Sequence, residues 1–147
     1  MELLLLVVVF LPLLTAIGIK IIAKYLNELL LNFITINSAL LSFATASGMF
    51  VLLFLNKYEP IHLKFFTWIT NPEILFEFTL DGLSGVMMLL VTGLSVVIQV
   101  FSTSYMSKDE HYGKYFVYFN VFVFSMLLLV MSGNFLVMFF GWELVGL

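Results

Sequence analysis

The final apolar run of the sequence contains one ionisable side chain, Glu143, in the stretch from Phe139 to Leu147. Moving an ionised carboxylate out of water costs several kcal/mol, so carboxylates within membrane spans usually face a bundle interior or a water-filled cavity and mark a path for protons or ions. A structural glutamate, satisfied by a hydroxyl or backbone group of a neighbouring helix, is the alternative. The position favours the first interpretation, which makes Glu143 the candidate residue for proton translocation.

Three other titratable side chains have simpler explanations. Asp81 precedes an apolar run, where a carboxylate can accept hydrogen bonds from the first turn of a helix, so we predict an N-cap. His62 and His111 have loop positions and no companion ligand at metal-binding spacing. The chain has no cysteine, which excludes thiolate ligation of an iron–sulfur cluster, haem or zinc within it. We therefore expect no metal site, no cofactor site and no nucleic-acid-binding patch.

The composition predicts a membrane protein. Of the 147 residues, 63% are hydrophobic and 10% are charged, and the mean hydropathy is +1.15, which leaves too little polar surface to cover a soluble globule. Apolar runs can be separated at residues 3–22, 33–55, 82–101, 115–131 and 135–147. Each of the first four has about the 20 residues that a bilayer core requires. We expect an all-α polytopic membrane protein with four full transmembrane helices and the first part of a fifth.

Residues 56–80, between the second and third runs, are predicted to lie outside the membrane because charged, aromatic and proline residues alternate there. Two stretches, Ile61–Phe65 and Ile74–Phe78, alternate in polarity and are joined near Asn71-Pro72. This pattern predicts an extramembrane β-hairpin between the second and third helices.

The third run has a side of small and polar residues, which are Ser84, Gly85, Thr92, Ser95, Gln99 and Ser102. Small residues let transmembrane backbones approach closely and hydroxyls join helices weakly, so the pattern favours helix packing over the alternative, the lining of a water wire. Gln99 is the least explained of these residues. Its amide has four hydrogen-bonding opportunities and needs partners in a bundle interior.

The lysines predict the orientation of the chain. The segments after the first and third runs hold Lys20, Lys24, Lys108 and Lys114, whereas the opposite side holds Lys57 and Lys64 among several glutamates. Because lysines are enriched on the cytoplasmic side, we expect the N-terminus and the hairpin outside and residues 104–114 on the cytoplasmic or matrix side. All six lysines are expected in loops, and the first span is expected to be retained rather than cleaved as a signal peptide.

The fifth apolar run covers residues 135–147, which at 1.5 Å per residue reach little more than halfway through a hydrocarbon core of about 30 Å. Carbonyl groups left unpaired in lipid are costly. The expectation is therefore that the chain is incomplete as a folding unit: either a second polypeptide continues or caps this helix after Leu147, or the sequence is a truncation.

From residue 80 onward the sequence resembles subunit 5 of respiratory complex I, the proton-pumping NADH:ubiquinone oxidoreductase. The resemblance rests on the order and spacing of Leu80-Asp81-Gly82-Leu83-Ser84-Gly85-Val86-Met87, Phe101 to Asp109, Tyr115-Phe116-Val117-Tyr118, Ser132-Gly133-Asn134 and Phe140 to Leu147. The first 79 residues fit more loosely, through Leu11-Pro12-Leu13-Leu14 and the hairpin. Gly141-Trp142-Glu143 with Val145-Gly146-Leu147 favours subunit 5 over the related subunits 2 and 4. The resemblance implies the N-terminal part of an antiporter-like transmembrane domain.

The resemblance also implies a role for Glu143. In the family, the glutamate at this position forms a buried ion pair with a lysine on a later helix, and changes in that pair accompany proton movement through the membrane arm. A nearby cation stabilises the carboxylate, so movement of the lysine changes the affinity of Glu143 for a proton. The lysine must come from outside this chain. NADH, FMN, iron–sulfur clusters and ubiquinone are expected on other subunits, and the partners are those subunits, membrane lipids and a chain that completes subunit 5 after Leu147.

Two other functions are compatible with the same helix plan. One is the large subunit of a multi-subunit Mrp-type sodium/proton antiporter, and the other is a structural membrane scaffold. The sequence is rich in Phe, Leu, Ile, Asn and Tyr and contains lysine but no arginine. This composition is typical of proteins encoded by AT-rich genes. We therefore expect a multi-pass protein of the mitochondrial inner membrane, with a bacterial plasma membrane as the alternative.

Overall fold

The computed structural model describes the whole chain except residues 1, 23–24, 26, 58, 71–72 and 108. Its elements are α1 (Glu2–Ile22), α2 (Glu28–Leu55), β1 (Ile61–Thr70), β2 (Glu73–Leu80), α3 (Gly82–Tyr105), α4 (Tyr112–Val130) and α5 (Phe135–Gly146). Within these described residues, α1 to α4 are long and apolar enough to cross a membrane, whereas α5 is shorter. The predicted fold class is confirmed, with the hairpin between α2 and α3.

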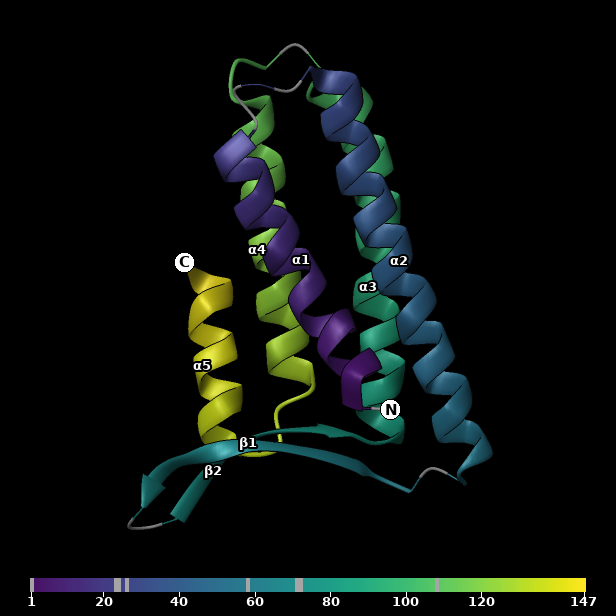
Figure 1. Ribbon diagram of the computed structural model, residues 1–147, viewed down its shortest axis with the longest axis vertical. Coiled ribbons are helices and arrows are strands. Elements are labelled where there is room, and N and C mark those ends of the chain that lie inside the picture. The colour runs from purple at the N-terminus through teal and green to yellow at the C-terminus, as the bar shows by residue number, and fades with distance from the viewer. Residues whose placement is uncertain (1, 23–24, 26, 58, 71–72, 108) are drawn as a thin grey trace.

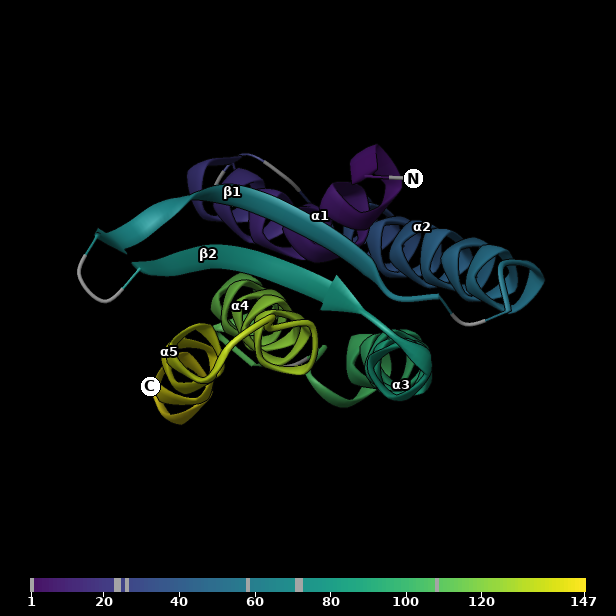
Figure 2. The same cartoon turned by 90° about the horizontal axis from the view of Figure 1, so that it is seen from below.

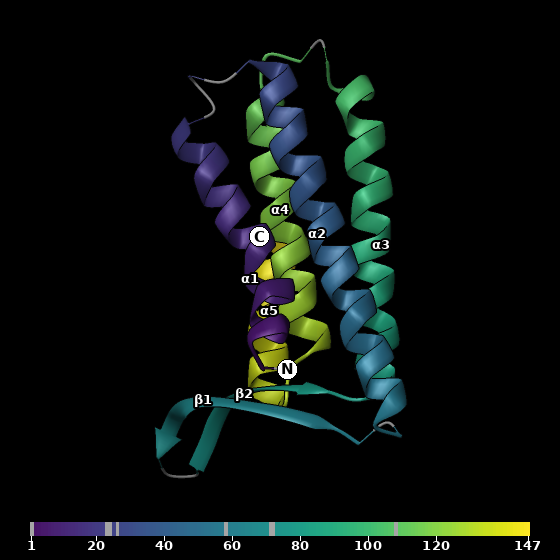
Figure 3. The same ribbon diagram turned by 45° about the vertical axis from the view of Figure 1, so that its right-hand side comes forward.

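The four long helices stand side by side, and the hairpin lies across one end of the bundle (Figures 1 and 2). α1 packs against α2 and α4, α3 packs against α2 and α4, and α5 packs against α4. The N-terminal end of α1 and the hairpin are at the same end of the bundle, as the lysine pattern predicts, and the C-terminal ends of α1 and α3 are at the other end. The last turn of α5 lies beside the middle of α4 (Figures 1 and 3).

Two apolar clusters form the core. The larger cluster lies at the hairpin end and contains residues from all five helices and both strands, among them Val8, Met49, Phe78, Met88 and Leu127. The smaller is at the opposite end and consists of Ile19, Leu31, Tyr112 and Phe116 with partly buried neighbours. Many large apolar side chains remain exposed on the outer faces of the helices, which suits a surface covered by lipid or by other protein.

Three boundaries differ from those predicted from the apolar runs. α2 begins at Glu28 rather than Phe33, because the Asn27 side chain accepts a hydrogen bond from the backbone N–H of Leu30 at 3.0 Å and caps the helix there. α3 extends to Tyr105 and α4 begins at Tyr112, so polar residues continue both helices beyond the apolar core. Apolar composition marks the membrane-buried part of a helix and not its ends.

The expectation that every lysine lies in a loop was wrong for three of them. Lys64 lies in strand β1. The other two lie at helix ends, Lys20 in the last turn of α1 and Lys114 in the first turn of α4. Long lysine side chains can extend from a helix end toward water, so both positions remain compatible with a membrane span. Lys24, Lys108 and the predicted turn at Asn71-Pro72 lie outside the described residues.

β1 and β2 pair antiparallel from Ile61↔Leu80 to Thr70↔Glu73, with register shifts between Lys64 and Phe66 and between Thr67 and Ile69. The strands are longer than the predicted stretches and are rich in aromatic side chains. The rings of Phe66 and Phe76 stack with centroids 5.5 Å apart. Phe78, which is fully buried, points into the larger apolar cluster and attaches the hairpin to the bundle.

Candidate functional site

The helix that carries Glu143 is fixed at its first turn by Asn134. The side-chain oxygen of Asn134 accepts a hydrogen bond from the backbone N–H of Val137 at 3.0 Å, which caps α5. The amide nitrogen of the same side chain donates to the carbonyl oxygen of Leu75 on β2 at 2.5 Å. One side chain therefore both starts α5 and ties it to the hairpin.

The turn between α4 and α5 is joined to β2 by backbone hydrogen bonds as well. The N–H of Thr79 donates to the carbonyl of Met131 at 2.8 Å, and the N–H of Gly133 donates to the carbonyl of Glu77 at 3.0 Å. Phe78 and Ser132 form an antiparallel bridge between these bonds. A Cβ on Gly133 would lie 2.4 Å from the Cγ of Glu77, so a larger residue here would force the Glu77 side chain to move.

The rotation of α5 about its own axis is set where it contacts α4. Val137 and Gly141 are the buried residues of α5, four positions apart on one face of the helix. A Cβ on Gly141 would lie 2.7 Å from the backbone nitrogen of Leu129 and 2.8 Å from its Cα, so the two backbones touch at this point. Small residues allow this approach between membrane helices.

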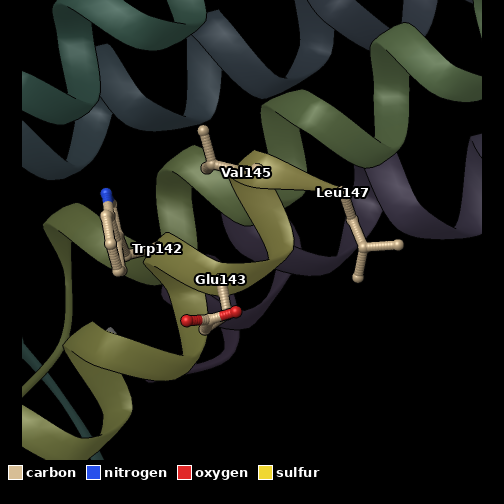
Figure 4. A pocket seen from close by; sticks show the side chains of 5 residues that line it. Trp142, Glu143, Val145 and Leu147 are labelled. Carbon is tan, nitrogen blue, oxygen red and sulfur yellow. The ribbon is translucent and has the colours of Figure 1, made fainter.

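Glu143 consequently faces away from α4. It follows Gly141 by two residues, and at 3.6 residues per turn its side chain lies about 200° around the helix from the contact. The side chain is exposed in this chain and borders a shallow recess formed by α5 alone, together with Trp142, Val145, Gly146 and Leu147. Figure 4 shows the carboxylate of Glu143 and the ring of Trp142 projecting from different sides of α5.

Two aromatic contacts support α5 around the carboxylate. Trp142 packs on Phe139, with ring centroids 5.9 Å apart, and Phe140 meets Trp68 of β1 edge-on at 6.1 Å. The second contact is a further link between the hairpin and α5. Among the described residues no cation is paired with Glu143, so the arrangement presents the carboxylate outward on a helix whose other face is fixed to the bundle.

A second groove adjoins the end of α5 and shares Val145 and Leu147 with the recess beside Glu143. It is lined by α1, α4 and α5, including Ala16, Lys20, Val121, Leu144 and Val145. Lys20 is exposed and at the end of α1. It lines this groove and not the recess beside Glu143.

The predicted N-cap at Asp81 is confirmed. Its carboxylate accepts hydrogen bonds from the N–H of Ser84 at 2.7 Å and from the hydroxyl of Ser84 at 2.9 Å, and the Ser84 hydroxyl accepts from the N–H of Asp81. The hydrogen bond from the Ser84 N–H is the main reason why the pKa of Asp81 lies below its ordinary value of 3.8. Capping fully accounts for this carboxylate.

The two histidines lie in separate places. The Nδ1 atom of His62 is 3.1 Å from the hydroxyl of Thr79 across the hairpin, and His111 precedes α4 without a capping side-chain bond. In the part of the chain that the structure describes, no three His, Cys, Asp or Glu side chains form a group that could hold a metal ion.

Gln99 is buried and donates to Asn120, a partner on α4 that the sequence did not single out.

Sequence reasoning singled out Glu143 as a candidate but did not identify the residues that position it. Asn134 had a readable signal, because an asparagine directly before an apolar run is a common helix cap. Gly133 and Gly141 had none of comparable strength, since the space at each glycine is limited by contacts with Glu77 and Leu129 that are distant in the sequence or set by helix packing.

Comparison with known proteins agrees with this fold. The family model for the N-terminus of chain 5 of NADH-ubiquinone oxidoreductase (complex I) matches residues 66–116. NADH-quinone oxidoreductase subunit L of Buchnera aphidicola (strain Sg) is 35% identical over 100% of the chain and 24% of its own length. The corresponding Campylobacter jejuni protein is 40% identical over 79% of the chain and 19% of its length. NADH-ubiquinone oxidoreductase chain 5 of Rhizopus stolonifer is 41% identical over 60% of the chain and 14% of its length.

A solved structure of similar fold belongs to the membrane-bound sulfane sulfur reductase, an archaeal respiratory membrane complex. It covers 99% of the chain and 28% of its own chain with a TM-score of 0.85 and 19% identity, so the likeness concerns the fold. The architecture is thus that of a multi-pass membrane protein. The chain belongs to the subunit 5 family of NADH-quinone oxidoreductase, called subunit L in the bacterial relatives, and corresponds to the N-terminal part of that family. It spans about a quarter or less of the length of these relatives.

Proposed function

We propose that the chain is part of a proton-translocating membrane-arm subunit of NADH:quinone oxidoreductase, and that Glu143 is its proton-carrying residue. The observation that carries this proposal is the geometry of α5. Asn134 and Gly141 fix the helix to β2 and α4, and the carboxylate two residues after Gly141 points outward from an apolar helix whose last turn lies beside the middle of α4. A carboxylate placed there needs a partner.

The proposed partner is a lysine on the part of the subunit that lies beyond the matched quarter of the relatives. Residues of that part of the subunit would cover the recess at Glu143. Such a pair is bistable, because the lysine stabilises the charged carboxylate when it is near and releases it for protonation when it moves. The other partners would be the remaining membrane-arm subunits and lipid.

We also propose that the chain itself has no redox role. NADH oxidation and quinone reduction would take place on other subunits, where NADH, FMN, iron–sulfur clusters and ubiquinone are bound. The sequence contains no cysteine that could ligate a cluster. The proposed location is the mitochondrial inner membrane, with the bacterial plasma membrane as the alternative. The amino-acid composition, which is typical of proteins encoded by AT-rich genes, supports this location.

The test is Glu143→Gln in the native complex. Glutamine keeps the volume and the length of the glutamate side chain and can still form hydrogen bonds, but it has no titratable group. The complex should assemble normally, and proton uptake by reconstituted vesicles per NADH oxidised should fall. The control is Glu110→Gln, which removes an exposed carboxylate from the segment between α3 and α4 and should leave pumping unchanged.

Unchanged pumping in Glu143→Gln with normal assembly would return Glu143 to a structural role. Loss of assembly alone would favour the scaffold function. A purified complex that exchanges sodium for protons without quinone reduction would instead assign the chain to the Mrp-type antiporters.

A further inference from the structure

A cluster of buried polar side chains separates the two apolar clusters of the bundle. Along α4, Phe116 belongs to the smaller cluster and Val123 to the larger, and Asn120 lies between them. On α3 the buried face changes from Met88 to Ser95, Gln99 and Ser102 toward the end opposite the hairpin. Each of these polar side chains is at most 3% exposed, so none of them reaches lipid.

Gln99 is incompletely satisfied in this cluster. Its Nε2 atom donates a long hydrogen bond to Oδ1 of Asn120 at 3.4 Å, and the Asn120 amide donates to the carbonyl of Phe116 at 2.8 Å. The Oε1 atom of Gln99 is buried and has no hydrogen-bond partner among the described residues. A buried acceptor without a donor costs about 1–3 kcal/mol, so native proteins usually supply a donor, commonly an ordered water.

Neighbouring polar groups offer further hydrogen-bonding sites for a water molecule that donates to Oε1 of Gln99. One turn before Gln99, the hydroxyl of Ser95 donates to the carbonyl of Thr92 at 2.7 Å, which leaves its lone pairs free to accept. One turn after Gln99, Ser102 is bonded to the hydroxyl of Tyr115 at 2.7 Å. An internal water typically makes about three hydrogen bonds, and this cluster provides donors and acceptors on two helices.

The polar groups also continue to the end of the bundle. The hydroxyl of Tyr112 donates to Asn32 of α2 and lies 3.4 Å from the carbonyl of Thr103, next to the exposed segment between α3 and α4. Polar groups of Ser102, Tyr115 and Tyr112 therefore lie between Gln99 and the end of the bundle opposite the hairpin. Close helix packing explains the small serines, but it does not explain a glutamine oxygen buried without a donor.

We propose that α3 and α4 enclose a water-binding pocket at Gln99 and Asn120, hydrated from the end of the bundle that carries residues 103–112. Water donates to Oε1 of Gln99 and links the amide pair to Ser95 and to the Ser102–Tyr115 pair. The pocket gives solvent and its protons access to the interior of the helix bundle on the side of α4 that faces α3, whereas α5, which carries Glu143 on its outward face, contacts α4 at Leu129. The proposal does not depend on the function assigned to Glu143.

The most direct test is an experimental map of the intact complex at a resolution that shows ordered water. The expected result is density within hydrogen-bonding distance of Oε1 of Gln99, and its loss in Gln99→Leu. The proposal is overturned if both amide atoms of Gln99 bond to protein and no such density is present in the unchanged complex. The density map of the unchanged complex decides the question whether or not a variant folds.

Cysteine reactivity tests the route of hydration, because the chain contains no cysteine of its own. Ser95→Cys and Ser102→Cys add thiols on either side of Gln99, and Ser125→Cys is the matched control, since Ser125 is fully buried on α4 and bonds only to its own helix. Methanethiosulfonates react with the thiolate, which forms in a hydrated site and not in an apolar one.

In vesicles of the intact complex, mass spectrometry of this chain should show labelling of Ser95→Cys and Ser102→Cys at least about tenfold faster than Ser125→Cys, given the thiolate requirement. The label should enter from the side of residues 103–112, and adding Gln99→Leu should slow labelling of Ser95→Cys. Equal rates at all three cysteines, or faster labelling from the hairpin side, would overturn the proposal.

Discussion

Replacement of Gly141 by alanine tests whether the contact between α5 and α4 positions Glu143. The added Cβ would lie 2.7 Å from the backbone nitrogen of Leu129, and ordinary van der Waals contact begins at 3.4 Å, so the helices must separate by about 0.7 Å at this point. Overpacking of this kind costs about 1–3 kcal/mol. The gain in helix propensity from glycine to alanine is about 1 kcal/mol and does not offset the upper part of that range.

The functional effect should exceed the effect on stability. Glu143 is two residues from the contact on the same rigid helix, so it moves with the backbone. A displacement approaching 1 Å can cost about 10²-fold in a reaction that requires exact placement of the reacting groups. Gly141→Ala should therefore assemble in reduced amount and, per assembled complex, pump fewer protons for each NADH oxidised.

The assay is proton uptake in reconstituted vesicles, normalised to assembled complex in the same preparation. Gly48→Ala is the control, because Gly48 is also in a transmembrane helix and an added Cβ there meets nothing within 4 Å. The control should match the unchanged protein in both measurements. If Gly141→Ala also matched it in assembly and in pumping, the contact with α4 could not be what positions Glu143.

Three further predictions concern the helix caps and the orientation of the chain. Asn134→Ala should destabilise the start of α5 by about 1 kcal/mol and lower pumping, whereas Asn134→Ser keeps a capping oxygen and should retain most of the stability, as measured by thermal unfolding. Folding lowers the pKa of Asp81, so its charged carboxylate stabilises the protein at pH values above the ordinary pKa of 3.8. This stabilisation is lost as the pH falls through the lowered pKa. Asp81→Asn should lack this acid-dependent part of the thermal stability. A membrane-impermeant amine reagent applied on the hairpin side should label Lys64 and not Lys114, and the reverse result would invert the topology.

Local sequence patterns predicted much of the fold. The apolar runs located all the helices, since lipid exposure requires a continuous apolar stretch whatever the neighbours are. The alternation around His62 and Glu77 indicated the hairpin, and Asp81 before Gly82 indicated the start of α3. Boundaries were less accurate where a polar residue such as Asn27 caps the helix outside the apolar run.

The sequence by itself determined that this is a multi-pass membrane protein with a hairpin and with one carboxylate, Glu143, in its last apolar run. Only the tertiary structure decided which way that carboxylate faces, because the rotation of α5 depends on the contact of Gly141 with Leu129 and on the bond from Asn134 to β2. It also decided that Gln99 meets Asn120. Such contacts join residues far apart in the chain, and their geometry follows from the packing of whole helices and not from any local pattern.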